Sequence, residues 1–219
     1  MATDAADKPL RADAARNRRR ILAAAADVFA ERGLDVSLDD IAAAAGVGVG
    51  TVYRRFPCKD DLIDALFDDK MAELEAVGHA ALEIEDPWEA FVAFMTGVCE
   101  HHARDRGLKE AMFVTGTISS ERVQQAKARM APIGRELLRR AQAAGVIRDD
   151  VGHFDVPLMH FTVGFAAEKT RDAAPDYWRR LLTLYLDGLR VRRDDVTPMP
   201  APQLAPEQFL ASMTRKSKR

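Results

Sequence analysis

Apolar side chains recur every three or four positions along most of this 219-residue chain. That spacing places them on one face of a helix and is typical of amphipathic α-helices. Glycines and prolines interrupt the pattern, and no alternating run of β-branched residues indicates a strand. The pattern predicts a short helix after residue 105 and longer helices over residues 14–32, 38–45, 49–56, 60–84, 87–103, 120–144, 154–171 and 176–193. We therefore expect an all-α protein.

Residues 38–59 carry the most informative local pattern, a helix, a glycine-marked turn and a second helix. Ser37 precedes an apolar run, and two carboxylates, Asp39 and Asp40, follow Ser37 closely. They suit the positive end of a helix that Ser37 caps. Gly46 then interrupts an alanine-rich segment where the chain must turn, because glycine adopts left-handed dihedral angles without steric cost. The segment therefore predicts a helix-turn-helix.

The second helix of this unit, residues 49–56, presents hydroxyl, phenol and guanidinium groups. In a helix-turn-helix the second helix enters the major groove of DNA, with its first residues near base edges and its polar face near phosphates. The side chains in question are Thr51, Tyr53, Arg54 and Arg55. The sequence therefore predicts an N-terminal three-helix DNA-binding domain.

Residues 21–66 resemble the DNA-binding domain of the tetracycline-repressor (TetR) family of bacterial regulators. The matching residues are Ile21, Leu22, Ala25, Phe29, Gly33, Ser37, Ile41, Ala45, Gly46, Val47, Thr51, Val52, Tyr53, Phe56, Lys59 and Leu62. The resemblance implies that Thr51, Tyr53 and Lys59 grip phosphates and that Val47, Gly48, Val49 and Arg54 lie near bases or the adjoining backbone. It also places Ser37 among the DNA-binding residues.

Charge and composition agree with a small, specific DNA footprint. The chain is 47% hydrophobic and 30% charged, with a formal net charge of -2, so it lacks the positive field of a protein that coats nucleic acid. Its positive charge is instead local, before the first helix and at Arg54, Arg55 and Lys59. No apolar run approaches the ~18 residues of a membrane span, and residues 1–20 lack the apolar core of a signal peptide. We expect a cytoplasmic protein without a membrane partner.

Four regions follow from these patterns. We expect a flexible N-terminal arm at 1–13, the DNA-binding domain at 14–66 and a helical effector-binding and dimerisation domain at 67–193. Residues 194–219 are rich in proline and end in basic residues, so we expect a disordered tail there.

The last two long helices each carry a wide apolar stripe with spacings of four, three and four. The stripes are Phe154, Leu158, Phe161 and Phe165, and Trp178, Leu182, Tyr185 and Leu189. In the TetR family the corresponding pair packs against its copy as a four-helix bundle, which implies a homodimer on a pseudo-palindromic operator. The alternative is that both stripes only close the core of one subunit.

The middle of the chain, residues 60–144, resembles the effector-binding body of the family, and residues 102–108 resemble its SbtR-like subgroup. A cavity between these helices would be lined by large apolar side chains, since ligand pockets are mostly apolar and methionine adapts to irregular ligands. The candidates are Phe91, Phe94, Met95, Met112, Phe113 and Met130. The alternative for each of them is ordinary core packing.

Other signals do not indicate catalysis or a cofactor. Residues 46–50 alternate glycine and valine but lack the spacing of a nucleotide-binding loop and follow a helix. His101 and His102 are adjacent, and Pro157 separates His153 from His160, so we expect no metal site. No catalytic constellation stands out, and an enzyme is not expected. Cys58 precedes a helix N-terminus and Lys59, which favour a thiolate, yet no resolving cysteine is visible and a passive role is favoured over redox sensing.

The sequence thus predicts a sequence-specific transcriptional regulator, a repressor released by a small molecule. The alternative is a helical small-molecule sensor or carrier that has lost operator binding. The effector, the operator sequence, the regulated genes and the sign of control stay open.

Overall fold

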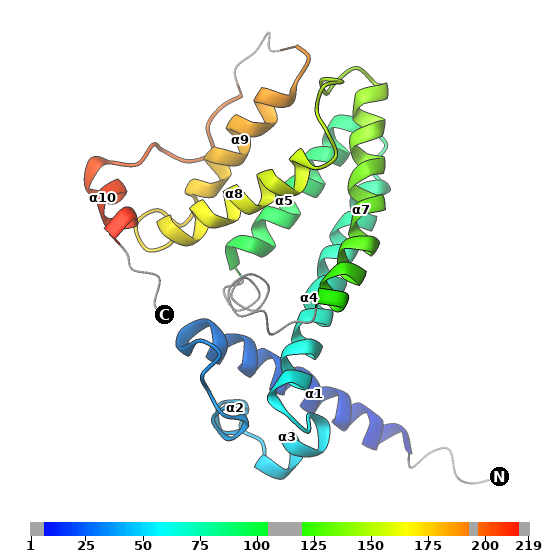
Figure 1. Ribbon diagram of the computed structural model, residues 1–219, viewed down its shortest axis with the longest axis vertical. Helices are drawn as coiled ribbons and strands as arrows, with labels where there is room; N and C mark the ends of the chain where they lie inside the picture. Colours follow the sequence, from blue (N-terminus) through cyan, green and yellow to red (C-terminus); the bar gives the residue numbers. More distant parts are fainter. Residues whose placement is uncertain (1–6, 105–119, 193–196, 215–219) are drawn as a thin grey trace, which may run out of the picture. The chain divides into compact units, whose positions relative to one another are not determined.

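The structure is a computed structural model of the 219-residue chain, and it describes residues 7–104, 120–192 and 197–214 (Figure 1). Within these ranges all regular secondary structure is helical, apart from one isolated bridge between Ile147 and Arg190, so the all-α prediction is confirmed. The helix expected after residue 105 and the candidate residues Met112 and Phe113 lie outside the described residues. The chain divides into two compact units, and the border between them crosses two helices, after Lys70 and after residue 123.

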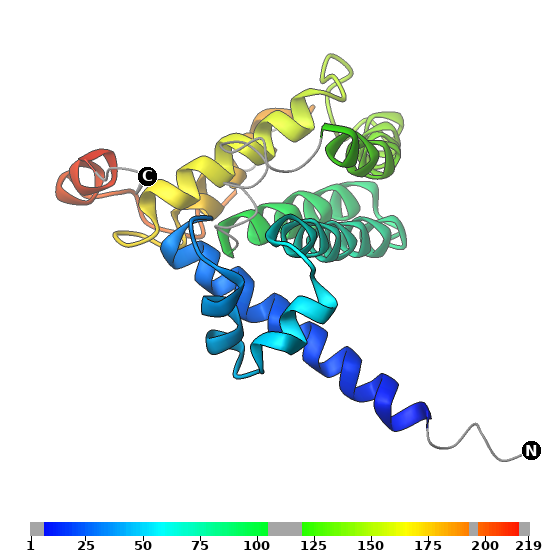
Figure 2. The ribbon, with the colours of Figure 1, turned by 60° about the horizontal axis from the view of Figure 1, so that its bottom comes forward.

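The N-terminal unit contains α1 (Asp7–Arg32), α2 (Leu38–Ala45), α3 (Val49–Arg55) and the start of α4 (Lys59–Leu82). Figures 1 and 2 show α2 and α3 on the same side of α1. A small core fixes them there, with apolar side chains from all four helices. Its members include Ile21, Leu22, Ala25, Phe29, Leu38, Ile41, Ala42, Val52, Leu62 and Ile63, all buried.

Helix α1 begins earlier than the sequence predicts. It starts at Asp7, so residues 7–13 belong to a helix and the flexible arm expected over residues 1–13 is corrected for them. Pro9 stands in the first turn, where the missing N–H costs no intrahelical bond. An ion pair between Asp13 and Arg16, one turn apart, further supports this part of the helix.

The C-terminal unit contains the rest of α4, α5 (Pro87–Arg104), α7 (Ser120–Ala143, from residue 124), α8 (Asp155–Thr170), α9 (Tyr177–Leu189) and α10 (Pro206–Thr214). Helices α5, α8 and α9 pack against one another, and Figure 1 shows α8 and α9 side by side. The start of α7 is assigned to the other unit.

Helices α4 and α7 approach closely within the C-terminal unit. A Cβ atom added to Gly78 would lie 2.7 Å from Cγ2 of Ile133, so only glycine fits at this crossing. Arg140 reaches the end of α4, where its guanidinium donates hydrogen bonds to the carbonyls of Leu82 at 2.8 Å and Ile84 at 2.7 Å. These bonds satisfy carbonyl groups that the helix itself leaves unpaired.

The disordered tail expected from residue 194 onward is corrected by α10, which packs on α8. Pro206 stands at the first helical position, which suits proline, so the helix begins where the proline-rich stretch ends. Gln208 Nε2 donates to the carbonyl of Ala173 at 2.8 Å, and Ala201 is buried. The prolines before residue 206 therefore indicate a connection that leads into α10, and not a disordered tail.

Among the described helices, none combines the length and apolar character that crossing a membrane requires.

Candidate nucleic-acid interface and ligand cavities

Helix α2 is fixed at its start by a reciprocal pair of side chains. The Ser37 hydroxyl accepts a hydrogen bond from the backbone N–H of Asp40 at 3.1 Å, and the Asp40 carboxylate accepts one from the backbone N–H of Ser37 at 3.0 Å. The Ser37 hydroxyl also donates to Oδ2 of Asp40 at 2.6 Å, and this bond, together with that from the Ser37 N–H and the nearby Arg32, lowers the pKa of Asp40. The predicted cap is confirmed, and the Ser37 hydroxyl is occupied within the protein.

The turn after α2 has the backbone geometry that the sequence predicts. Gly46 has a φ of 61° in the left-handed region, and the N–H groups of Gly46 and Val47 donate to the carbonyls of Ala43 and Ala42, each at 3.1 Å. This is the glycine-ended helix terminus in which two orphan carbonyls are satisfied. The turn sets the direction in which α3 leaves α2.

Arg20 ties this turn to α1. Its Nη2 donates to the carbonyl of Ala45 at 2.9 Å and to that of Gly46 at 3.2 Å. Arg18 makes a second tie, with Nη1 3.0 Å from both carboxylate oxygens of Asp69 in α4. In the sequence, Arg18 and Arg20 are recognisable only as members of a positively charged run. No local signal identifies partners that lie 25 and 51 residues away.

Helix α3 has one buried side and one exposed side. Val52 is fully buried and Phe56, just after the helix, is nearly so, whereas Val49 is 42% and Tyr53 47% exposed. Arg54 and Arg55 are exposed as well, and residues 49–55 contain no acidic side chain. The exposed side is therefore a positively charged surface with one phenol.

The first turn of α3 has little side-chain bulk. Gly48 and Gly50 are exposed, a Cβ added to Gly50 would meet nothing within 4 Å, and one added to Gly48 would meet only Oγ1 of Thr51 at 3.9 Å. Neither glycine is therefore required by the packing of the protein itself. Arg54 folds back along the helix and donates to the carbonyl of Gly50 at 3.2 Å and to Thr51 Oγ1 at 3.3 Å.

Lys59 and Cys58 lie at the start of α4. The Lys59 ammonium donates to the carbonyl of Leu34 at 2.8 Å, so this predicted phosphate contact also holds the loop before α2. The Cys58 thiol faces a carboxylate, with Sγ 3.1 Å from Oδ2 of Asp61, and the backbone N–H of Cys58 donates to the same oxygen at 3.3 Å. Cys58 thus occupies the position immediately before the first residue of α4, where a capping side chain stands.

The C-terminal unit holds a mainly apolar cavity of about 470 Å³ between α5, α7 and α8. Of the candidate residues, Phe94 and Met130 line it. Phe91 and Met95 are fully buried but are not among the lining residues, so they are corrected to core packing. All four residues lie on one side of α5, with spacings of three and four, so helical spacing alone does not distinguish the cavity wall of Phe94 and Val98 from the core positions of Phe91 and Met95.

His160 is the residue of this cavity that the sequence analysis missed. Pro157 separates His153 from His160 in the sequence, yet both histidines line the cavity. Pro157 lies in the first turn of α8, where proline does not break a helix. The histidine within the apolar pattern of this helix was the available signal.

The imidazole of His160 is only 6% exposed, and its Nε2 atom has no hydrogen-bond partner. The edge of the ring meets Phe94, with centroids 5.5 Å apart, and the His102 ring lies 6.4 Å away. Burial lowers the pKa of His160 from 6.5 to about 3, and His102 adds to the effect. The side chain is therefore neutral at physiological pH.

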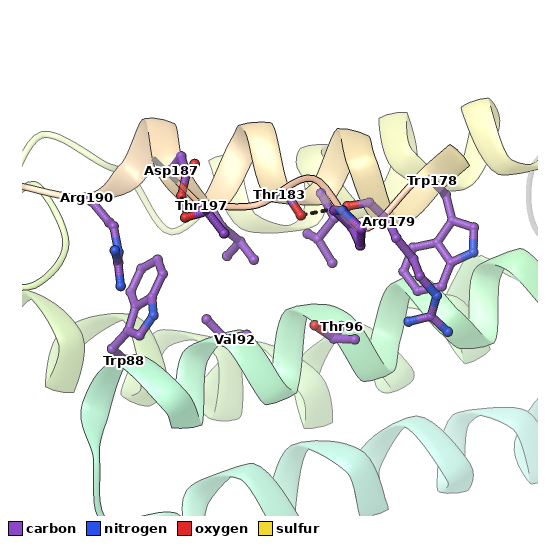
Figure 3. Close-up of a pocket in the computed structure, with 12 residues that line it drawn as sticks. Trp88, Val92, Thr96, Trp178, Arg179, Thr183, Asp187, Arg190 and Thr197 are labelled. Carbon is purple, nitrogen blue, oxygen red and sulfur yellow. Dashed lines mark hydrogen bonds between the residues drawn. The ribbon is translucent and has the colours of Figure 1, made fainter. Parts of the chain in front are cut away.

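A smaller cavity of about 250 Å³ lies between α5 and α9 (Figure 3). Its polar lining is committed to internal contacts. The guanidinium of Arg190 lies 4.3 Å from the ring of Trp88, and Arg179 Nη2 lies 3.2 Å from a carboxylate oxygen of Glu100. Thr197 Oγ1 donates to Asp187 at 2.5 Å. Of the two cavities, the larger one better matches the apolar pockets that bind small molecules.

The two predicted dimerisation stripes differ in the structure. On α8 the stripe is exposed, with Phe154 at 71%, Leu158 at 59%, Phe161 at 38% and Phe165 at 59%. On α9, Trp178 and Leu182 are each only 3% exposed and face their own unit, which corrects their assignment to a dimer interface.

The remaining residues of α9 explain this correction. Leu186 is also buried, so Trp178, Leu182 and Leu186 form the inward side of the helix, which packs on α5 and α8. Tyr185 and Leu184 are exposed, and Leu189 is half-buried. On α8 and α9, the large apolar side chains that remain exposed are therefore the α8 stripe, Leu184 and Tyr185.

A helix-turn-helix with an acid-free exposed helix, together with a helical unit that contains a cavity, defines a transcriptional regulator of the DNA-binding class. Residues 21–66 match the family described as bacterial regulatory proteins of the tetR family, and residues 86–191 match the C-terminal domain of SbtR-like transcriptional regulators. The chain belongs to the TetR family, whose members are regulators and not enzymes.

Individual relatives agree with this assignment. The chain is 33% identical over 139 residues to the HTH-type transcriptional regulator SrpR of Pseudomonas putida, a match that covers 61% of this chain and 65% of that protein. A TetR regulatory protein of Mycobacterium vanbaalenii is 37% identical, with a TM-score of 0.64, over 84% of this chain and 100% of that one. The regulator SCO0520 of Streptomyces coelicolor is 32% identical, with a TM-score of 0.61, over 79% and 98%.

Proposed function

We propose that this protein binds a pseudo-palindromic DNA operator as a homodimer, represses transcription there and releases the operator when a small molecule enters the C-terminal unit. The observation that carries the proposal is the exposed side of α3, which has no acidic residue. The capped helix α2 and the turn that Arg20 binds hold α3 in place. A helix offered in this way suits the major groove. Thr51, Tyr53 and Lys59 then contact phosphates, and Arg54 reaches base edges.

The open first turn of α3 supports close approach to DNA. Because the fold does not need glycine at position 50, the absent side chain leaves room for another molecule. Arg54 bonds only within its own helix at distances of 3.2 and 3.3 Å, so a guanine or phosphate can displace these contacts. Arginine binds the two acceptors of guanine bidentately, which makes Arg54 the main candidate for base recognition.

The exposed face of α8 supports the homodimer. Four large apolar side chains in one stripe, with Leu184 and Tyr185 beside them on α9, form a patch of the kind that marks a protein interface. A second copy of the chain is the natural occupant, because two-fold symmetry presents two α3 helices to one duplex. Half-sites then lie about 34–36 Å apart, one turn of DNA.

Helix α4 supports the coupling between ligand and DNA, because it is one continuous helix that begins in the N-terminal unit and ends in the C-terminal unit. Arg18 binds Asp69 near the border, and Arg129 binds Glu75 beyond it. A ligand that favours one position of α4 alters the spacing of the two α3 helices. A release of ~100-fold requires about 2.7 kcal/mol of coupling, and the operator must weaken ligand binding by the same factor.

Selection of binding sites from random duplex DNA with the purified protein tests the proposal. We expect two related half-sites with a centre-to-centre spacing of about one helical turn. Arg54→Ala should change the selected sequence, whereas Tyr53→Phe should weaken binding to all sequences alike. If no sequence is enriched, the chain is instead a small-molecule sensor that has lost operator binding.

A further inference from the structure

The cavity between α5, α7 and α8 contains one buried polar atom that the protein does not use. His160 lines the cavity, and its buried Nε2 atom has no hydrogen-bond partner in the part of the chain that the structure describes. Buried polar atoms are nearly always bonded, and each exception requires an explanation. A neutral imidazole nitrogen either donates or accepts a hydrogen bond, depending on the tautomer.

The rest of the lining decides which ligand charge is tolerated. Among the described residues that line the cavity there is no aspartate or glutamate, so a buried cation would lack a counter-charge from them. Arg135 and His153 are exposed, and Arg135 Nε already donates to the carbonyl of Ala131 at 3.2 Å. An anionic group would therefore stay at the exposed side of the cavity, in contact with water.

We propose that this cavity takes an uncharged, mainly apolar molecule whose one buried hydroxyl or carbonyl group hydrogen-bonds to Nε2 of His160. The volume of about 470 Å³ falls within the range of small-molecule sites, and Phe94, Val98 and Met130 supply its apolar walls. The inference rests on the proposed function in that it treats this unit as the receiver of the effector. It adds the chemical class of the ligand and the residue that selects it.

Three biphenyl probes of nearly equal shape test this selection on the free protein. The probes are biphenyl without a polar group, uncharged 4-phenylphenol and anionic biphenyl-4-carboxylate, measured by displacement of the uncharged dye Nile red. We expect the phenol to bind about tenfold more tightly than biphenyl, the factor typical of one hydrogen bond in a dry site. The carboxylate should bind more weakly than the phenol. Equal affinities for phenol and biphenyl, or a preference for the carboxylate, would overturn the proposal.

Substitution of the histidine assigns the effect to one atom. In His160→Phe the phenol should lose its advantage, so that the ratio of the two affinities falls to about one, while biphenyl still binds. His160→Gln keeps a polar amide at the site and should retain part of the preference. His79→Phe, at an exposed position of α4 outside the cavity lining, is the matched control and should leave the ratio unchanged. A preference that persists in His160→Phe would contradict the assignment.

A spectroscopic measurement covers the case in which His160→Phe does not fold. In protein labelled with ¹⁵N-histidine, 4-phenylphenol should shift the Nε2 resonance of His160, and biphenyl should shift it much less. Equal shifts would count against the hydrogen bond. None of these measurements includes DNA, so they are independent of the proposed regulation. If the phenol binds through His160 but no compound of its class weakens operator binding, the repressor proposal fails and the cavity assignment stands.

Discussion

In the N-terminal unit, the polar side chains that shape the helix-turn-helix bond to groups of the same unit, whereas the described part of the C-terminal unit has one buried histidine nitrogen without a hydrogen bond and an exposed apolar side of α8. Ser37 pairs with Asp40, Arg20 binds the turn after α2, and Lys59 binds the carbonyl of Leu34. Nε2 of His160 has no hydrogen-bond partner among the described residues, and the stripe on α8 is exposed, although Phe161 and Phe165 contact His102 and Lys169. The helix-turn-helix is thus held by contacts within its own unit, and the C-terminal unit has the features on which the proposed effector and second subunit depend.

The largest expected effect comes from the α8 face. Leu158→Glu combined with Phe165→Glu should yield monomers and weaken operator binding at least about 100-fold, because one subunit contacts only one half-site. Both side chains are 59% exposed in the single subunit, so its fold should persist. Analytical ultracentrifugation and gel-shift titration measure the two effects. Phe209→Glu on α10, 51% exposed, is the control and should remain a dimer.

The next effect concerns the pH dependence of stability. Folded His160 stays neutral down to about pH 3, while the unfolded chain takes up the proton below about pH 6.5. The unfolded state therefore binds more protons in this window, and stability falls as the pH falls. Between pH 6.5 and 5 this group should cost about 2 kcal/mol, which His160→Phe should abolish. Urea unfolding of both proteins at the two pH values measures the difference. Identical losses in both proteins would show that His160 is not buried neutral.

Two glycine substitutions separate folding from DNA recognition within the N-terminal unit. Gly46→Ala should lower the free energy of unfolding by about 1–2 kcal/mol, since φ is 61° and the new Cβ would lie 3.1 Å from Nη2 of Arg20. Gly50→Ala should instead raise it by about 0.5–1 kcal/mol, because alanine favours a helix.

Operator binding gives the second half of this prediction. Gly50→Ala should weaken it even though the protein is more stable, because the methyl group occupies the open first turn of α3. Thermal unfolding and gel-shift titration provide the two readings. A Gly50→Ala protein that binds its operator as well as the parent would indicate that this turn does not approach DNA closely.

The smallest expected effect comes from Lys59, and it distinguishes a phosphate contact from a purely structural role of this side chain. If its ammonium contacts a phosphate in the complex, Lys59→Ala should reduce the slope of log affinity against log salt by about one. If the bond to the Leu34 carbonyl is its only role, the substitution should lower stability and leave the slope unchanged. Arg55→Ala on the exposed side of α3 provides a comparison in which no such internal bond is recorded.

Local signals predict the N-terminal unit well. The cap at Ser37, the left-handed Gly46 and the bounds of α2 each depend on a few neighbouring residues, and the structure confirms them. Arg18 and Arg20 could not be placed in the same way, because their partners are Asp69 and the turn carbonyls. Long-range partners of charged side chains leave no periodic trace in the sequence.

The C-terminal unit was harder to predict because an apolar stripe does not indicate which surface the helix packs against. The stripes on α8 and α9 look alike in the sequence, yet Trp178 and Leu182 face inward and Phe154 and Phe165 face outward. A stripe at helical spacing says only that one side is apolar. For the same reason Phe91 and Met95 resemble cavity residues although they are core, and His160 escaped notice within an apolar helix.

The unpartnered nitrogen of His160 makes the melting temperature of this protein a report on its ligand. A molecule that binds only the folded state raises stability by RT ln(1 + [L]/Kd), about 2.7 kcal/mol at a hundredfold excess over Kd. Apolar compounds that merely fill the cavity stabilise both the native protein and His160→Phe. Compounds that bond to the histidine stabilise the native protein more. A thermal-shift screen run in parallel on the two proteins therefore separates specific effectors from nonspecific hydrophobic binders before any operator is known.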